Sequence, residues 1–525
     1  MKKKGNPNAL KTLIAGFILH FILGTFHTWQ SILRYFNSFL LEFNETPIHH
    51  KYLEIIFAVS NVTHGLSMCV GVLLTGWFSS LKITGAGLMI RTIAELFYIV
   101  FPNIKIVTLN IFISSVANGL VYLPVILDIL RYYPKSKGKS IAFVLYGFGI
   151  NRLIFKYVSI YMIDPDSVEM IHGTQSYPSI INNNFKIYLK MYLMFYSLLS
   201  ALCVFLIHPY QSQSKTNEEE EEKLFYKRKL TTDPSTIRNL INIDKNFKEE
   251  DQDKGGENND EDENEDDDHY IKYLLDKICC KKKKIKNGEK VEEPFSSLII
   301  SFPFIQLTFI FFFTMIIGFV ELSSIRKLGS LNGHSEFFLW KTSFLFKAFN
   351  ASTLPLWGYI LDKIGFKTFY SVILIVQIII SSMCFFISSN QVGFILFNGI
   401  SALLHSVNLA IQLTTYVLIF GNEKGVLLYS ISWMLIYIFY IARPFISNIF
   451  VSKIQYLMFY ITLTLFTMIA LIILSFFVEK KHVYIDPSKG DENSDEDKEL
   501  EDMKFEESES DEDDDDDNIK KKKKK

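Results

Sequence analysis

The chain of 525 residues contains few of the patterns that mark enzymes and secreted proteins. Its five cysteines, Cys69, Cys203, Cys279, Cys280 and Cys384, have neither the spacing of a disulfide framework nor that of a metal site. A phosphate-cradling glycine loop, a catalytic triad, a redox cysteine pair and a basic nucleic-acid patch are also missing. We therefore expect no enzyme, no ATP-driven pump, no metal, no cofactor and no nucleic-acid partner.

Long apolar runs are what the sequence has in abundance. Hydrophobic residues make up 49% of the chain and aromatic residues 15%. A run of about 20 apolar residues is long enough to cross a bilayer as a helix. Such runs predict a polytopic α-helical membrane protein with spans at residues 10–33, 53–77, 82–101, 106–127, 140–162, 186–207, 299–322, 337–361, 368–388, 391–419, 425–449 and 454–478.

Two segments rich in charge separate and follow these runs. Blocks such as "ENNDEDENEDDD" and "DEDDDDD" repel themselves and favour disorder. Cys279 and Cys280, beside lysines 281–284, are either part of such solvated sequence or acylated anchors. The predicted organisation is a tail at 1–9, a six-helix half at 10–208, a disordered loop at 209–294, a second six-helix half at 295–478 and a disordered tail at 479–525.

Basic residues in the short loops predict the orientation in the membrane. The loops "RYYPKSKGKS" (131–140) and "DKIGFK" (362–367) carry most of these lysines and arginines, which favour the cytosolic side. With an even number of spans, both termini and the 209–294 loop lie on that side too. The plasma membrane is the expected location, with an organelle membrane as the alternative.

Four stretches together resemble the major facilitator superfamily, and in particular its monocarboxylate transporter and oxalate/formate antiporter branch. They are "AGFILHFILGTFHTW" (15–29), "GLVYLPVILDILRYYPKSKGKSIAFVLYGFG" (119–149), "GYILDKIGFK" (358–367) and "FGNEKG" (420–425). The resemblance implies an all-α fold of twelve transmembrane helices in two six-helix pseudo-repeats, with a substrate site between them. It also implies that Gly358, Asp362, Gly365 and Lys367 act in gating; the alternative is a tight basic loop without that role.

The sequence departs from the family pattern at two positions. Ser80 stands where the first-half loop usually has an acid, so the first-half gate is expected to be weaker. Leu354 stands where the eighth span usually has an arginine. Lys347, two helical turns earlier and on nearly the same face, is a candidate replacement.

Charged side chains fall inside several spans, where a cation is costly unless something offsets it. Arg152 lies near mid-depth of the fifth span, and Lys156 follows one turn later on the same face. Cations outnumber acids at membrane depth, so an organic carboxylate is the expected substrate. The predicted substrate-binding residues are Arg152, Lys156, Lys347, Arg443, Tyr122 and Asn350. For Lys156 and Arg443 the alternative is snorkelling to the interface.

Proton coupling would require a group that titrates near neutral pH. His27, in the family-like "GTFHTW", and Glu95, which shares a helix face with Arg91, are the candidates. The alternatives are a hydrogen-bonded packing role for His27 and an internal ion pair for Arg91 and Glu95.

These features predict a secondary active transporter of small, monocarboxylate-like organic anions, working by alternating access as a symporter or antiporter. Its partners would be the anion, the lipid bilayer and, if coupled, protons. Two alternatives remain at this stage: an amino-acid or other small-solute transporter of the same fold, and a non-transporting membrane sensor or scaffold.

Overall fold

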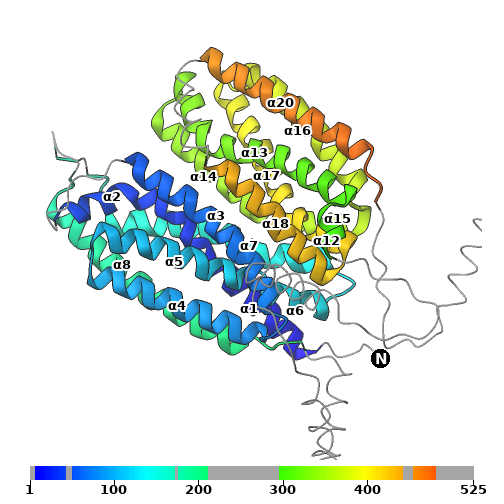
Figure 1. Cartoon of the computed structure of the whole chain (residues 1–525). Coiled ribbons are helices and arrows are strands. Elements are labelled where there is room, and N and C mark those ends of the chain that lie inside the picture. Colours follow the sequence, from blue (N-terminus) through cyan, green and yellow to red (C-terminus); the bar gives the residue numbers. More distant parts are fainter. Residues whose placement is uncertain are drawn as a thin grey trace, which may run out of the picture. The chain divides into compact units, whose positions relative to one another are not determined.

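The computed structural model describes residues 6–42, 50–168, 170–171, 176–210, 295–441 and 453–479. All of them belong to one compact unit, and every regular element in this part of the chain is helical (Figure 1). The predicted disordered segments fall almost entirely outside the described residues, as does Arg443.

The first half is built from the helices that precede residue 211. They are α1 (Pro7–Gly24), the 3₁₀ turn Thr25–Thr28, α2 (Trp29–Leu41), α3 (His50–Leu74), α4 (Ser80–Val100), α5 (Ile104–Tyr122), α6 (Pro124–Tyr132), α7 (Lys137–Ile163) and α8 (Ser179–Leu206). Two pairs of them, α1 with α2 and α5 with α6, are interrupted single spans, so this half contains six spans.

The second half repeats this count after residue 294. Its helices are α12 (Phe295–Ile299), α13 (Phe302–Leu331), α14 (Glu336–Ser352), α15 (Leu354–Ile364), α16 (Phe366–Ile387), α17 (Gln391–Phe420), α18 (Asn422–Tyr440) and α20 (Lys453–Ser475). Helices α14 and α15 form one interrupted span. Within the described ranges, nine helical segments are long and apolar enough to cross a membrane on their own.

The sequence-based spans did not include the interruptions, which have local causes. Pro124 and Pro355 stand in the first turns of α6 and α15, where a missing N–H is tolerated but a continuous helix is not. In the first span, the Thr25 hydroxyl donates to the Ile22 carbonyl (2.7 Å) where α1 ends. The first and fourth spans also run further than predicted, to Leu41 and Tyr132.

Positive φ angles at two glycines turn the chain sharply between neighbouring spans. Gly365 (φ 87°) ends α15 and Gly421 (φ 83°) ends α17. Residues with a side chain rarely adopt this conformation. Each glycine is the single residue between two helices, α15 and α16 at Gly365 and α17 and α18 at Gly421.

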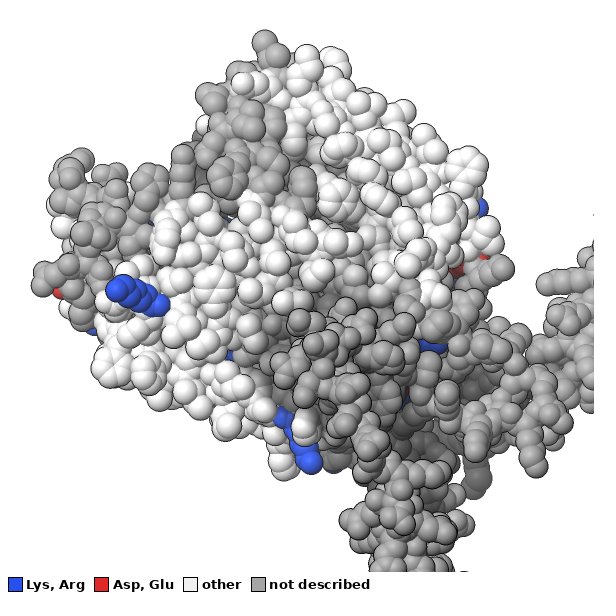
Figure 2. Space-filling model, viewed as in Figure 1, with Lys and Arg blue, Asp and Glu red and all other residues white. Residues whose placement is uncertain are grey.

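The helices pair closely within and between the halves. Helix α3 packs along α5 and α1 along α7 in the first half, and α20 packs against α13 and α16 in the second. The two halves meet where α7 lies along α14 and α15, and where α3 lies along α18. On the face shown in Figure 2, the described residues are mostly uncharged, with isolated lysine or arginine side chains, as expected for a surface in lipid.

Candidate functional site

A cavity lies at the junction of the two halves. The first half contributes α3, α5 and α7, and the second contributes α14, α15, α17 and α18. The lining residues are Asn61, His64, Met68, Tyr122, Leu145, Phe148, Gly149, Arg152, Asn350, Leu354, Leu409, Tyr429, Trp433 and Tyr437. A site shared in this way changes shape whenever the halves move relative to each other.

Arg152 is the charged member of this described lining. Its guanidinium carbon lies 4.9 Å from the ring centre of Phe148, one turn earlier on α7. A cation over an aromatic face at this distance is attracted by the ring quadrupole. Tyr122 and Asn350 line the same cavity, so three of the predicted substrate-binding residues come together.

The other predicted substrate-binding residues lie elsewhere. Lys156 is not among the lining residues, and its ammonium nitrogen is 5.8 Å from the ring centre of Tyr157. Lys347 is half-buried on α14 and does not line the cavity, whereas Leu354 does. Arg443 lies outside the residues that the structure describes.

Aromatic rings form much of the cavity wall, and apart from Tyr122 they were not among the predicted site residues. Tyr429, Trp433 and Tyr437 follow one another at four-residue spacing on α18, with ring centres 6.1 and 5.1 Å apart. The hydroxyl groups of Tyr122 and Tyr429 interact across the junction. The His64 ring stands edge-on to Tyr437 at 6.0 Å. The four-residue spacing was the available signal, but it is common in transmembrane helices.

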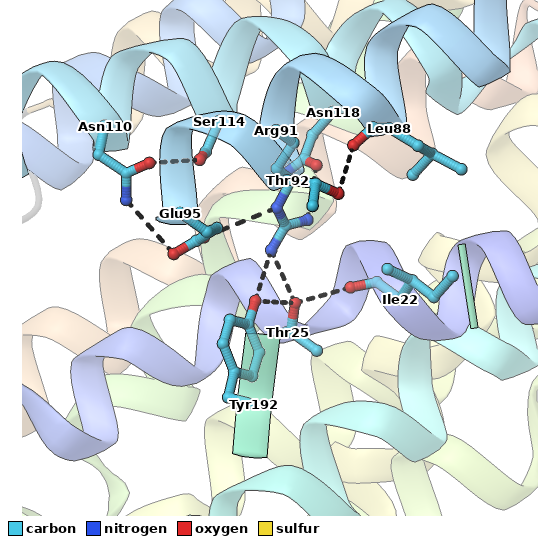
Figure 3. A network of polar contacts seen from close by, with 10 residues as sticks. All are labelled: Ile22, Thr25, Leu88, Arg91, Thr92, Glu95, Asn110, Ser114, Asn118 and Tyr192. Carbon is cyan, nitrogen blue, oxygen red and sulfur yellow. Dashed lines mark hydrogen bonds and ion pairs between the residues drawn. The ribbon is translucent and has the colours of Figure 1, made fainter. Parts of the chain in front are cut away.

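Arg91 and Glu95 belong to a separate network inside the first half (Figure 3). The Arg91 guanidinium donates to Asn118 Oδ1 (2.7 Å), Thr25 Oγ1 (2.8 Å) and the Tyr192 hydroxyl (2.9 Å). Its Nε lies 3.9 Å from Glu95 Oε1, and both side chains are 1% exposed. Neither residue lines the cavity.

This network fixes the interruption of the first span. Thr25 begins the 3₁₀ turn, and it bonds both Arg91 and Tyr192. A buried ion pair is stable only if further hydrogen bonds satisfy its remaining donors and acceptors, and Asn110 also bonds Glu95 (3.4 Å). His27 lies in the same turn, but its side chain is outside the described residues.

Asp362 connects the halves at one end of the α7–α15 contact. Its carboxylate accepts the backbone N–H groups of Gly138 (2.8 Å) and Lys139 (2.9 Å) in the first turn of α7. These N–H groups have no partner within their own helix, and the helix dipole favours an anion there. A Cβ at Gly138 would meet the Gly358 carbonyl oxygen at 2.6 Å, so both glycines are needed for the close approach.

Lys367, another predicted gating residue, acts within the second half. Its ammonium group donates to the Ser475 carbonyl (2.9 Å) at the end of α20. The Glu479 carboxylate accepts the backbone N–H groups of Phe366 and Lys367, both at 3.0 Å. Gly365 provides the sharp turn between Asp362 and these contacts. The loop therefore has one partner across the junction and another inside its own half.

A second link between the halves lies near Ser80. Arg131 at the end of α6 forms a 2.6 Å ion pair with Glu423 in the first turn of α18, and its other nitrogen is 3.6 Å from Asp128. Ser80 donates a hydrogen bond to the buried Asp128. An acid is thus present beside the first-half loop, but Asp128 of α6 supplies it instead of residue 80.

Comparisons with known proteins give a fold but no close relative. No protein-family description and no curated protein matches the chain. Among solved structures, the human organic anion transporter MFSD10 (TETRAN) matches with a TM-score of 0.54 and 10% identity, over 90% of this chain and 100% of that one. The proton:xylose symporter XylE bound to 6-bromo-6-deoxy-D-glucose matches with 0.54 and 13%, over 90% and 96%. FucP in the outward conformation matches with 0.56 and 11%, over 90% and 99%.

These matches confirm the predicted fold class. XylE and FucP are described as members of the major facilitator superfamily, and the chain aligns with nearly their whole length. The chain has this fold, and its described helices make up two similar halves of six spans each. The monocarboxylate and oxalate/formate branch is not distinguished from other branches by these matches.

Proposed function

We propose that this chain, a multi-pass membrane protein with the fold of the major facilitator transporters, is a secondary active transporter of small organic anions. The observation that carries the proposal is Arg152 in the wall of the cavity between the halves. Arg152 brings a positive charge to the cavity wall, and a carboxylate substrate would carry the complementary charge. The planar guanidinium can bind both carboxylate oxygens at once.

Alternating access would operate through the links between the halves. The Asp362 and Arg131 contacts lie at the ends of helices that border the basic loops, on the predicted cytosolic side. With both contacts formed, the halves are joined on that side. Inward opening would break them and expose the cavity to the cytosol. The location of both termini in the cytosol and of the protein in the plasma membrane belongs to the same proposal.

Proton coupling through His27, Glu95 or Arg91 is a further part of the proposal. Glu95 is buried beside Arg91 and bonded to Asn110. A change in its protonation would therefore have to accompany a rearrangement of that network. Because Thr25 in the broken first span belongs to the network, such a rearrangement would reach the turn that carries His27.

A cavity lined from both halves favours a transporter over a sensor or scaffold. Uptake into liposomes containing the purified protein tests the proposal, with short and aromatic carboxylates and amino acids as substrates, with and without a pH gradient. We expect carboxylate uptake that Arg152→Ala abolishes or weakens. Uptake unaffected by this change, or no uptake of any acid in the panel, would contradict the proposal.

A further inference from the structure

We infer that the cavity is built for an aromatic carboxylate that also carries a neutral hydrogen-bond donor, such as a hydroxyl group. The inference rests on the proposed transport function and names the substrate class of the same site. Three features of the wall support it: the aromatic surface, the position of Arg152 and an unused acceptor on α3.

The aromatic surface is larger than a short acid can cover. Five lining residues are aromatic, three of them on successive turns of α18, and Met68, Leu145, Leu354 and Leu409 complete an apolar wall. A three-carbon acid such as lactate has only its methyl group to place against this apolar wall. A ring stacked edge-to-face or offset against such a wall removes apolar surface from water on both sides.

Arg152 determines where the charged end of the ligand would lie. Its guanidinium is held over Phe148 on α7, whereas the row of Tyr429, Trp433 and Tyr437 belongs to α18 in the opposite half. A ligand with its carboxylate at one end and an aromatic body at the other would contact both halves. Binding would then depend on how far apart the halves stand.

Asn61 on α3 provides the unused acceptor. Its side chain is 4% exposed, and its amide nitrogen donates to the Phe57 carbonyl (2.8 Å). Its Oδ1 is buried and has no hydrogen-bond partner among the described residues. Buried polar atoms in proteins nearly always have a partner, so an oxygen without one, on a residue that lines the cavity, is suited to accept from a ligand or a water.

His64 adds a second acceptor on the same helix. Its Nδ1 lies 3.4 Å from the Ser115 carbonyl, which can only accept, so in a neutral ring Nδ1 carries the proton and Nε2 accepts. Asn61 and His64 are three residues apart and share one face of α3. This wall is therefore matched to a donor on the ligand, while the described lining contains no carboxylate to pair with a full positive charge.

Competition by four related acids tests the contributions of the ring and of the hydrogen-bond donor separately. On purified wild-type protein, we would measure how lactate, 3-phenylpropionate, 3-phenyllactate and phenylalanine compete with labelled 3-phenyllactate for uptake into liposomes. 3-Phenyllactate differs from lactate by the ring and from 3-phenylpropionate by the hydroxyl. We expect it to compete at least tenfold better than lactate and at least fivefold better than 3-phenylpropionate. Phenylalanine should compete less well than 3-phenyllactate, because the described lining contains no carboxylate to pair with its ammonium group, and equal or better competition would overturn the preference for a neutral donor.

Two variants assign the preferences to residues. Asn61→Ala should remove the preference for 3-phenyllactate over 3-phenylpropionate. Asn398→Ala is the matched control, because Asn398 is equally buried, bonds the carbonyl four residues earlier (2.7 Å) and does not line the cavity. Trp433→Leu should reduce the preference for 3-phenyllactate over lactate.

The outcomes distinguish this inference from the proposed function. If lactate competes as well as 3-phenyllactate, or if the hydroxyl makes no difference in the wild type, the substrate class is wrong while Arg152-dependent uptake still supports an anion transporter. Preferences that persist in Asn61→Ala and Trp433→Leu would also overturn it. If none of the acids is transported, the proposed function itself fails.

Discussion

The carboxylate of Asp362 in the second half accepts a 2.8 Å hydrogen bond from the backbone N–H of Gly138 in the first half. The next N–H group, that of Lys139, bonds the other carboxylate oxygen. One side chain thus caps the start of a helix in the opposite half. A contact of this kind forms only in conformations that bring α7 and α15 together.

Removing this cap should favour opening on the side of the basic loops. In Asp362→Ala both N–H groups lose their partner, at a cost of about 0.5–2 kcal/mol, as for other N-terminal caps. We expect a cysteine placed at Leu145, in an otherwise cysteine-free chain, to react several-fold faster with a thiol reagent added from that side. Asp166→Ala, which changes an exposed acid in another loop, is the control and should leave the rate unchanged. If the cysteine reacts equally fast with and without Asp362→Ala, the Asp362 contact has no role in gating.

Adding a methyl group at Gly358 should force α7 and α15 apart. A Cβ there would meet the Gly138 carbonyl oxygen and the Ala142 side chain. Such overpacking costs about 1–3 kcal/mol. We expect Gly358→Ala to lower the Tm of the purified protein by several degrees. Gly85→Ala is the matched control, since a Cβ at Gly85 meets nothing within 4 Å, and its Tm should be unchanged or slightly higher.

Replacing Arg152 should weaken anion binding without preventing folding. Loss of one partner of a desolvated charge pair costs about 2–5 kcal/mol, so Arg152→Ala should raise the apparent Km for a carboxylate at least tenfold. Arg152→Lys restores the charge but not the planar guanidinium that binds both carboxylate oxygens, so it should recover only part of the affinity. Surface expression and the Tm serve as controls for folding. Wild-type Km in a well-expressed Arg152→Ala protein would make Arg152 a structural residue.

The Arg91 network should matter for stability more than Arg152 does. Arg91→Ala leaves Glu95 buried without its cation, and breaking a buried pair in this way costs about 3–5 kcal/mol. We expect a large fall in the Tm or in the yield of folded protein. Glu95→Gln, which keeps the shape and a neutral amide, should be milder. Lys190→Ala removes an exposed cation and should have little effect.

If uptake is coupled to protons through the first span, His27→Ala should flatten its dependence on the pH gradient. Histidine changes charge between about pH 5 and 8, and alanine cannot. The measurement compares initial uptake rates at several external pH values and fixed internal pH. Affinity for the anion at a single pH should change less than the slope. An unchanged slope would direct attention to Glu95.

The fold could be predicted well from the sequence because each membrane span is determined by residues that are neighbours in the chain. Each span is a run of apolar residues bounded by polar ones, which needs no knowledge of distant contacts. Depth along a helix follows from its rise per residue, which predicted Arg152 near the middle of its span. Tyr122 and Asn350 were predicted only as polar residues inside spans, and all three line the cavity. Pro124 and Pro355 also mark interruptions in the sequence, and we expected continuous spans only because hydropathy does not register them.

The remaining features depend on contacts between distant segments. Ser80 looks like the loss of an acid until Asp128, 48 residues away, is seen to bond it. Tyr429, Trp433 and Tyr437 cannot be told from lipid-facing aromatic residues without knowing which face of α18 meets the other half. Lys156 was expected at the cavity because it shares a face with Arg152, but one further turn along α7 takes it beyond the lining.

Close packing at Gly149, in the middle of α7, makes this position a natural pivot for the helix. Gly149 lies against Ala351 and Leu354, whereas Gly138 near one end contacts Asp362 and Tyr157 near the other contacts Phe344, with ring centres 4.9 Å apart. Gly138 is about 16 Å from Gly149 along the helix, so a tilt of about 10° there moves it by about 3 Å. Hydrogen bonds of 2.8 and 2.9 Å do not survive such a displacement. The same tilt moves Tyr157 by only about 2 Å in the opposite sense. A small rotation of α7 about Gly149 is therefore enough to break the Gly138–Asp362 contact at one end of the helix. The same rotation brings the other end, at Tyr157, closer to the second half.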